Sequence, residues 1–143
     1  MKSRYVRKLL KVILGLFLAF AGTGHLTFAR TEFVAQVPTW LPVEADLVVL
    51  ASGGVEIILG IGLIALPNYS KQFGLATAIF FGLIFPGNLA QFLEHRDAFG
   101  LDTDLARGLR LLFQPLLVVW ALWSTDAMKL LRPRQESNLR LRD

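Results

Sequence analysis

The sequence predicts an all-α membrane protein, a bundle of four transmembrane helices with the N-terminus and the C-terminus both in the cytoplasm. Hydrophobic residues make up 54% of the 143 residues, and the mean hydropathy is +0.52. A soluble domain of this length cannot bury so much apolar side chain. The apolar residues gather in four long runs, with most charged residues at the chain ends and between the runs. Lipid is therefore the expected solvent for the apolar surface.

The first two apolar runs predict helices over residues 10–29 and 47–66. No acidic residue, lysine or arginine lies between Val12 and Ala29. This run of about 18 residues exceeds the roughly 7–15 apolar residues of a signal peptide, so it predicts a membrane helix that is retained. The second run contains one charged residue, Glu56.

The third and fourth helices are predicted over residues 72–93 and 105–124. The stretch Pro67–Ser70 is a turn signal that separates the third helix from the second. The uncharged part of the fourth run, residues 111–123, is short. The fourth helix therefore needs residues from about Leu105 to reach a length that crosses a membrane.

The distribution of lysine and arginine predicts the orientation. Five of these residues lie within residues 1–11, one is Lys71, and five lie from residue 129 to the end of the chain. The other two connections hold the remaining four. The termini and the Lys71 turn together hold eleven lysines and arginines, against four in the other connections. This difference places both termini and the Lys71 turn in the cytoplasm. We expect residues 1–131 to form one transmembrane domain and residues 132–143 to form a basic, mobile cytoplasmic tail.

Six of the polar side chains inside the predicted helices are candidates for one buried cluster. An ionisable group at membrane depth costs roughly 2.5–3.5 kcal/mol on insertion scales, so it is expected to face the bundle interior and to have a partner. Helical spacing predicts that these side chains form an inward-facing cluster at matching depth in the outer half of the membrane. Glu56 is expected to pair with either Arg110 or His25, and the spacing does not choose between them. The predicted cluster is His25, Glu56, Asn88, Gln91, Arg110 and Gln114.

The predicted cluster has three interpretations. Polar residues often only lock the packing of membrane helices. The same residues also suit a site for a hydrophobic small molecule, such as a quinone or a lipid. A proton or ion pathway through Glu56 is the third interpretation. Haem ligation by His25 and His95 is disfavoured because their depths match only loosely, and two histidines without cysteine disfavour a metal site.

Other classes of function find little support in the sequence. No nucleophile–base set is apparent, so no catalytic residue is predicted. No basic and aromatic module for nucleic acid is apparent either, so membrane lipids are the expected partners. Faces of small residues suit a dimer as well as packing within one chain. The segment Glu32–Pro42 is too apolar for a plain loop and is predicted to lie along the outer surface as a short amphipathic element.

Four sequence motifs indicate a known family. They are AGTGHLTFA (Ala21–Ala29), VPTWLP (Val37–Pro42), SGGVEIILGIGLIALP (Ser52–Pro67) and FPGNLAQF (Phe85–Phe92). Together they resemble the DoxX-like family of small integral membrane proteins, and the resemblance covers roughly residues 10–125. A histidine in a G-x-H motif, a glutamate in an SG-x-x-E motif and a P-x-N element on the third helix recur in that family. They fall here on His25, Glu56, and Pro86 with Asn88.

The resemblance implies a small four-helix protein of a bacterial or archaeal plasma membrane. It also implies a partner in a redox system. We therefore expect a non-enzymatic accessory protein or subunit of a redox-linked membrane system, with a redox-complex protein as its partner and no resident cofactor. Two alternatives stay open. One is a small proton-coupled transporter that uses Glu56, and the other is an oxidoreductase subunit that interacts with a quinone.

Overall fold

The computed structural model describes residues 2–94 and 103–132, and every regular element within them is a helix. Four helices are long and apolar enough to cross a membrane: α1 (Lys2–Leu26), α3 (Ala45–Ala65), α4 (Ser70–Leu93) and α5 (Asp104–Ser124). The predicted all-α fold is thus confirmed, with four helices long and apolar enough to cross a membrane. The side of the membrane on which the termini lie stays a prediction.

The helices depart from the predicted spans mainly in α1, which begins at Lys2 rather than near residue 10. Lysine, arginine and leucine are good helix formers, so the helix continues through the basic start of the chain. α1 ends at Leu26, where the chain turns and the Ala29 amide donates to the carbonyl oxygen of Gly24 at 3.0 Å. Of the predicted mobile tail, residues 133–143 lie outside the described residues.

Three short helices connect or follow the long ones: α2 (Arg30–Val34), η1 (Pro67–Tyr69) and α6 (Met128–Leu131). α5 and α6 are separated by Asp126, which has a positive φ of 57°. The amide of Ala127 donates to the carbonyl oxygen of Leu122 at 3.0 Å, which closes the end of α5 in the manner of a Schellman motif. The chain therefore leaves the bundle sharply at Asp126.

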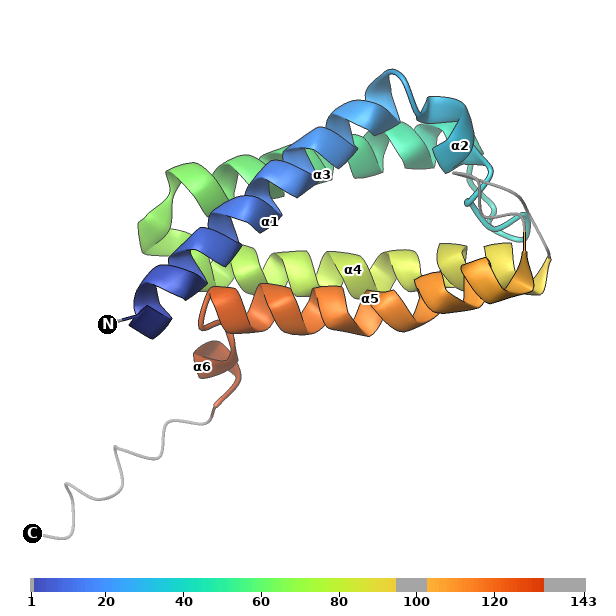
Figure 1. Ribbon diagram of the computed structural model, residues 1–143. Coiled ribbons are helices and arrows are strands. Elements are labelled where there is room, and N and C mark those ends of the chain that lie inside the picture. Colours follow the sequence, from blue (N-terminus) through green and yellow to red (C-terminus); the bar gives the residue numbers. More distant parts are fainter. Residues whose placement is uncertain (1, 95–102, 133–143) are drawn as a thin grey trace, which may run out of the picture.

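The long helices form two antiparallel hairpins, α1 with α3 and α4 with α5 (Figure 1). The hairpins meet at the end that holds the start of α1, η1 and α6, which we call the terminal end. They diverge toward the opposite end, which carries α2 and which we call the α2 end (Figure 1). The buried core between the hairpins is formed by Leu14, Leu18, Leu59, Leu63, Ala78, Phe80, Phe81, Leu117 and Ala121.

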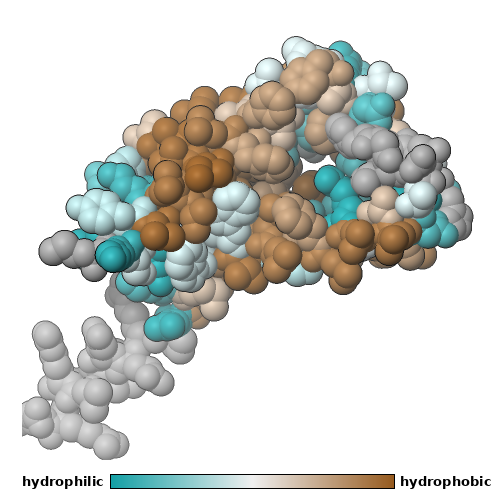
Figure 2. Space-filling view, in the orientation of Figure 1, coloured by the Kyte–Doolittle hydropathy of each residue, from teal (hydrophilic) through white to brown (hydrophobic). Residues whose placement is uncertain are grey.

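The outer surface of the bundle is largely apolar. Figure 2 shows hydrophobic residues over the middle of the molecule and hydrophilic residues toward both ends. Large side chains such as Phe17, Ile58 and Leu116 are about half exposed or more. Apolar patches of this extent mark contact with a partner or a membrane, which fits four membrane-spanning helices.

Four glycines bring α1 and α3 into close contact. A Cβ atom on Gly22 would lie 2.6 Å from the carbonyl oxygen of Gly53, and a Cβ atom on Gly60 would lie 2.5 Å from that of Gly15. Within each helix the two glycines are seven residues apart, so they share one face. Small residues at a membrane helix interface allow the two backbones to approach closely.

Gly53→Ala should lower the Tm, because its new Cβ atom would lie 2.6 Å from the Cβ of His25 and 2.9 Å from the carbonyl oxygen of Gly22. Overpacking of this kind costs about 1–3 kcal/mol. Gly54→Ala is the matched control, since a Cβ atom there has nothing within 4 Å. Thermal unfolding in detergent micelles, followed by circular dichroism, compares the two variants. Equal Tm values would contradict the close helix contact.

Candidate functional site

His25 and Glu56 are in contact between α1 and α3. The Nε2 atom of His25 lies 3.2 Å from Oε2 of Glu56, and its Nδ1 atom lies 3.1 Å from the carbonyl oxygen of Val49. The ring of Phe33, from α2, packs on the imidazole with a centroid distance of 3.5 Å. Both polar residues are buried, at 8% and 5% exposure. Of the two predicted partners of Glu56, His25 is the one in contact.

Arg110, on α5, is the other predicted partner of Glu56. It lies near enough for electrostatic attraction to the carboxylate, although the two form no ion pair among the described residues. Its Nε atom is buried and has no hydrogen-bond partner in this part of the chain. Arg110 therefore contributes a positive charge from the second hairpin without closing a direct contact with the first.

Three buried polar atoms of the predicted cluster have no hydrogen-bond partner among the described residues. They are Oε2 of Glu56, Nε2 of Gln91 and Nε of Arg110, and they come from α3, α4 and α5. The contact between Glu56 and His25 therefore lacks the geometry of a hydrogen bond. Since buried polar groups in native proteins nearly always have a partner, this set is unusual.

Asn88 and Gln114 form a separate group that joins α4 to α5. Asn88 donates from Nδ2 to Oε1 of Gln114 at 3.1 Å, and Gln114 donates from Nε2 to the carbonyl oxygen of Phe81 at 2.7 Å. Both side chains are buried, at 4% exposure each. Hydrogen bonds between membrane helices hold them together, so packing accounts for this pair.

Gln36 belongs to the site but was not predicted from the sequence. Its Nε2 atom donates to Oε1 of Gln91 at 3.3 Å, and its carbonyl oxygen lies 2.8 Å from the position of a Cβ atom on Gly87. The predicted amphipathic element at Glu32–Pro42 is instead the end of the five-residue helix α2 followed by irregular chain with Val37 buried. The signal available was a single amide within an otherwise apolar segment.

Counted along each helix from the α2 end, the members of the cluster lie at different distances, and their depth in the membrane stays a prediction. Glu56 is eleven residues from the first residue of α3, which is roughly 16 Å along the axis. Arg110 is six residues from the start of α5, roughly 9 Å, and Gln91 lies two residues before the end of α4. Polar groups therefore follow one another inward from the α2 end. His95, weighed above as a haem ligand, lies outside the described residues.

The chemistry of the site is that of polar recognition. Within residues 2–94 and 103–132, no group of three or more histidine, aspartate or glutamate side chains is arranged to hold a metal ion. The site offers a carboxylate as acceptor, and an amide and a guanidinium group as N–H donors. Figure 2 shows an opening between the two hairpins near the α2 end, with hydrophilic residues at its edge.

A family model matches residues 14–125 of the chain and is described as a domain of unknown function, DUF8561. This range includes all six residues of the predicted cluster and most of the four long helices. Comparisons with curated proteins and with solved structures gave no match.

Glu56→Leu should destabilise the fold, because it leaves His25 and Arg110 without an acidic neighbour in a buried setting. Loss of a buried polar partner costs about 1–3 kcal/mol. Glu44→Leu, at an exposed position just before α3, is the matched control. Purified yield and Tm in detergent measure the effect. A Glu56→Leu protein as stable as the control would show that Glu56 does not hold the hairpins in place.

Proposed function

We propose a ligand-binding role for this chain, which belongs to the DUF8561 family. It acts as a non-enzymatic accessory protein of a redox-linked membrane system and binds a hydrophobic small molecule, a quinone or a lipid, at its polar cluster. It crosses a prokaryotic plasma membrane four times, with both termini in the cytoplasm. The excess of lysine and arginine at the terminal end supports this orientation. The resemblance to DoxX-like proteins supports the link to a redox partner.

The observation that carries the proposal is a set of three buried atoms, on Glu56, Gln91 and Arg110, that form no hydrogen bond within the described part of the chain. Leaving a buried donor or acceptor unsatisfied costs about 1–3 kcal/mol for each group. The three groups belong to three helices and to both hairpins, so they are not explained by the contact of one helix pair. Polar groups along a ligand that bond to these atoms would remove this cost.

The residues around the cluster favour a ligand with a polar head on an apolar body. Gln91 and Arg110 supply N–H donors that suit carbonyl oxygens, and the Glu56 carboxylate suits a hydroxyl group. The surrounding helices expose apolar side chains to the membrane, from which such a molecule would enter (Figure 2). Quinones and lipids both combine these properties.

The contact between His25 and Glu56 favours a second candidate, a proton-coupled transporter. Both side chains can carry a proton, and both are buried in a membrane helix pair, where ionisable groups are often functional. Against a long relay, Asn88 and Gln114 bond to each other and carry no titratable proton. Reconstituted vesicles with an internal pH dye would separate the candidates, since a flux that is lost in Glu56→Gln would favour the transporter.

The proposed topology predicts which cysteine variants are labelled from outside the cell. The sequence contains no cysteine, so single variants can be introduced without background. Trp40→Cys, at a position 66% exposed near the α2 end, should react with a membrane-impermeant maleimide on intact cells. Ser3→Cys, at the exposed start of α1, should react only after permeabilisation. The reverse pattern would contradict the orientation.

Ligand binding predicts a co-purifying molecule that depends on Glu56. Native mass spectrometry of protein extracted gently from its own membrane should show a bound quinone or lipid. Glu56→Gln should reduce its occupancy, because a hydrogen bond contributes about 0.5–1.5 kcal/mol, or roughly two- to tenfold in affinity. Glu44→Gln makes the same chemical change at an exposed position and should retain the ligand.

Equal occupancy in the wild type, Glu56→Gln and Glu44→Gln would contradict the proposed site. Proteins that are equally folded but carry no bound molecule would also contradict the proposed site. The cluster would then serve helix packing alone. The mass of any retained molecule distinguishes a quinone from a lipid.

A further inference from the structure

The terminal end carries a basic hollow of about 630 Å³ between α1, the start of α4 and the end of α5. Four cationic side chains of α1 line it: Arg4, Arg7, Lys8 and Lys11. Asp126 is the acidic residue that lines it within the described part of the chain, and it already pairs with Arg7. Positive charge therefore exceeds negative charge in this hollow.

Lys11 is the most buried of these cations, at 7% exposure. Its Nζ atom donates to Oγ of Ser70 at 3.0 Å, and within residues 2–94 and 103–132 it forms no ion pair. A buried charge is costly unless it is paired, and a neutral hydroxyl does not neutralise it. The surroundings of Lys11 therefore favour an anion in the hollow.

Two further polar atoms in the lining of the hollow form no hydrogen bond among the described residues. Oγ of Ser124 and Nε of Arg7 are buried without a hydrogen bond, and both residues line the hollow. Ser124 is only 6% exposed. A hydroxyl group and a guanidinium N–H are suitable donors to the oxygens of a phosphate.

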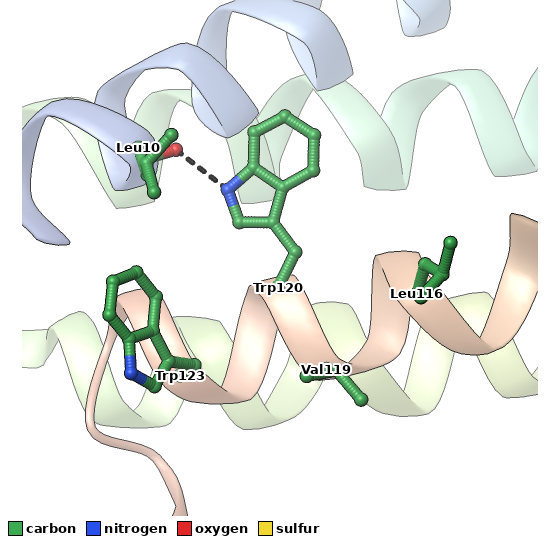
Figure 3. Close-up of a pocket in the computed structure, with 5 residues that line it drawn as sticks. All are labelled: Leu10, Leu116, Val119, Trp120 and Trp123. Carbon is green, nitrogen blue, oxygen red and sulfur yellow. Dashed lines mark hydrogen bonds between the residues drawn. The ribbon is translucent and has the colours of Figure 1, made fainter. Parts of the chain in front are cut away.

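An apolar groove of about 340 Å³ lies beside the hollow, between α1 and α5 (Figure 3). It is lined by Leu10, Leu116, Val119, Trp120 and Trp123. The Trp120 indole is fixed across the groove, since Nε1 donates to the carbonyl oxygen of Leu10 at 3.0 Å (Figure 3).

Arg7 connects the two features, because it lines the basic hollow while its guanidinium carbon lies 5.0 Å from the ring centroid of Trp123, which lines the groove. A charged hollow and an apolar groove thus share a border. This is the arrangement that a molecule with an anionic head and a hydrocarbon chain requires.

We propose that the basic hollow binds the phosphate of an anionic phospholipid and that the groove beside it holds one of the lipid's acyl chains. Anionic lipids are concentrated at the cytoplasmic surface, where the terminal end lies in the proposed topology, and basic residues near a membrane attract them. Basic residues that only set orientation would remain in solvent. Lys11, in contrast, is buried and lines the hollow together with Ser124.

Titration of the purified protein in neutral detergent, followed by native mass spectrometry, tests this proposal. Dioleoylphosphatidylglycerol should bind more tightly than dioleoylphosphatidylcholine. Lys11→Gln and Arg4→Gln should each weaken binding of the anionic lipid by about fivefold, the effect of one basic residue near an anionic surface. Arg4 is exposed, so its variant tests the site even if Lys11→Gln fails to fold. Lys71→Gln removes an exposed charge outside the hollow and should leave the affinity unchanged.

Val119→Trp, which fills the groove, should weaken lipid binding and leave any binding of inorganic phosphate unaltered. An equal loss of affinity for the anionic lipid in Arg4→Gln and Lys71→Gln would overturn the proposal. It would instead indicate diffuse attraction of the lipid to the positively charged terminal end. Equal affinity for the two lipids would overturn it as well. Full displacement of the lipid by inorganic phosphate would overturn the proposal and make free phosphate the occupant. If Val119→Trp binds the lipid as tightly as the wild type, no acyl chain occupies the groove.

Discussion

The close approach of α1 and α3 through two pairs of facing glycines is the contact on which the rest of the structure depends. Lipid is as apolar as the helices, so association in a membrane relies on close packing rather than on the hydrophobic effect. Glycine at these positions lets the backbones meet, because a Cβ atom at any of the four would lie within 3 Å of the other helix. Gly53 also leaves the space in which the Cβ of His25 sits. The contact between His25 and Glu56 therefore follows from the glycine packing.

The second hairpin is held together differently, by the amide bonds of Asn88 and Gln114 and by the absence of a side chain at Gly74, which admits Thr125. The hairpins meet at the terminal end and diverge toward the α2 end (Figure 1). Among the described residues, buried polar atoms without a hydrogen bond occur both around Glu56 and in the basic hollow. The two proposed sites differ in charge. The cluster around Glu56 offers an acceptor and donors together, whereas the hollow around Lys11 offers an excess of cations.

Much of the fold could be predicted from the sequence, because four long apolar runs leave few alternatives to four membrane helices. The start of α1 at Lys2 was not predicted, because the predicted span followed the apolar run, whereas the helix also includes the basic residues before that run. Burial of Glu56 was expected from its position in an apolar run, but its contact with His25 depends on the rotation of α1 against α3. Gln36 escaped prediction because it meets Gln91, 55 residues away, through the fold of an irregular segment.

A double-mutant cycle between Gly53→Ala and Glu56→Gln tests most directly whether the glycine contact positions the site. The free energy of unfolding is measured for the wild type, the two single variants and the double variant. If the added methyl group displaces His25 from Glu56, the Glu56→Gln change should cost less in the Gly53→Ala background, with a coupling of about 1 kcal/mol. Gly54→Ala, whose Cβ atom has no neighbour within 4 Å, should show no coupling. Additivity of Gly53→Ala and Glu56→Gln within about 0.3–0.5 kcal/mol would contradict this account.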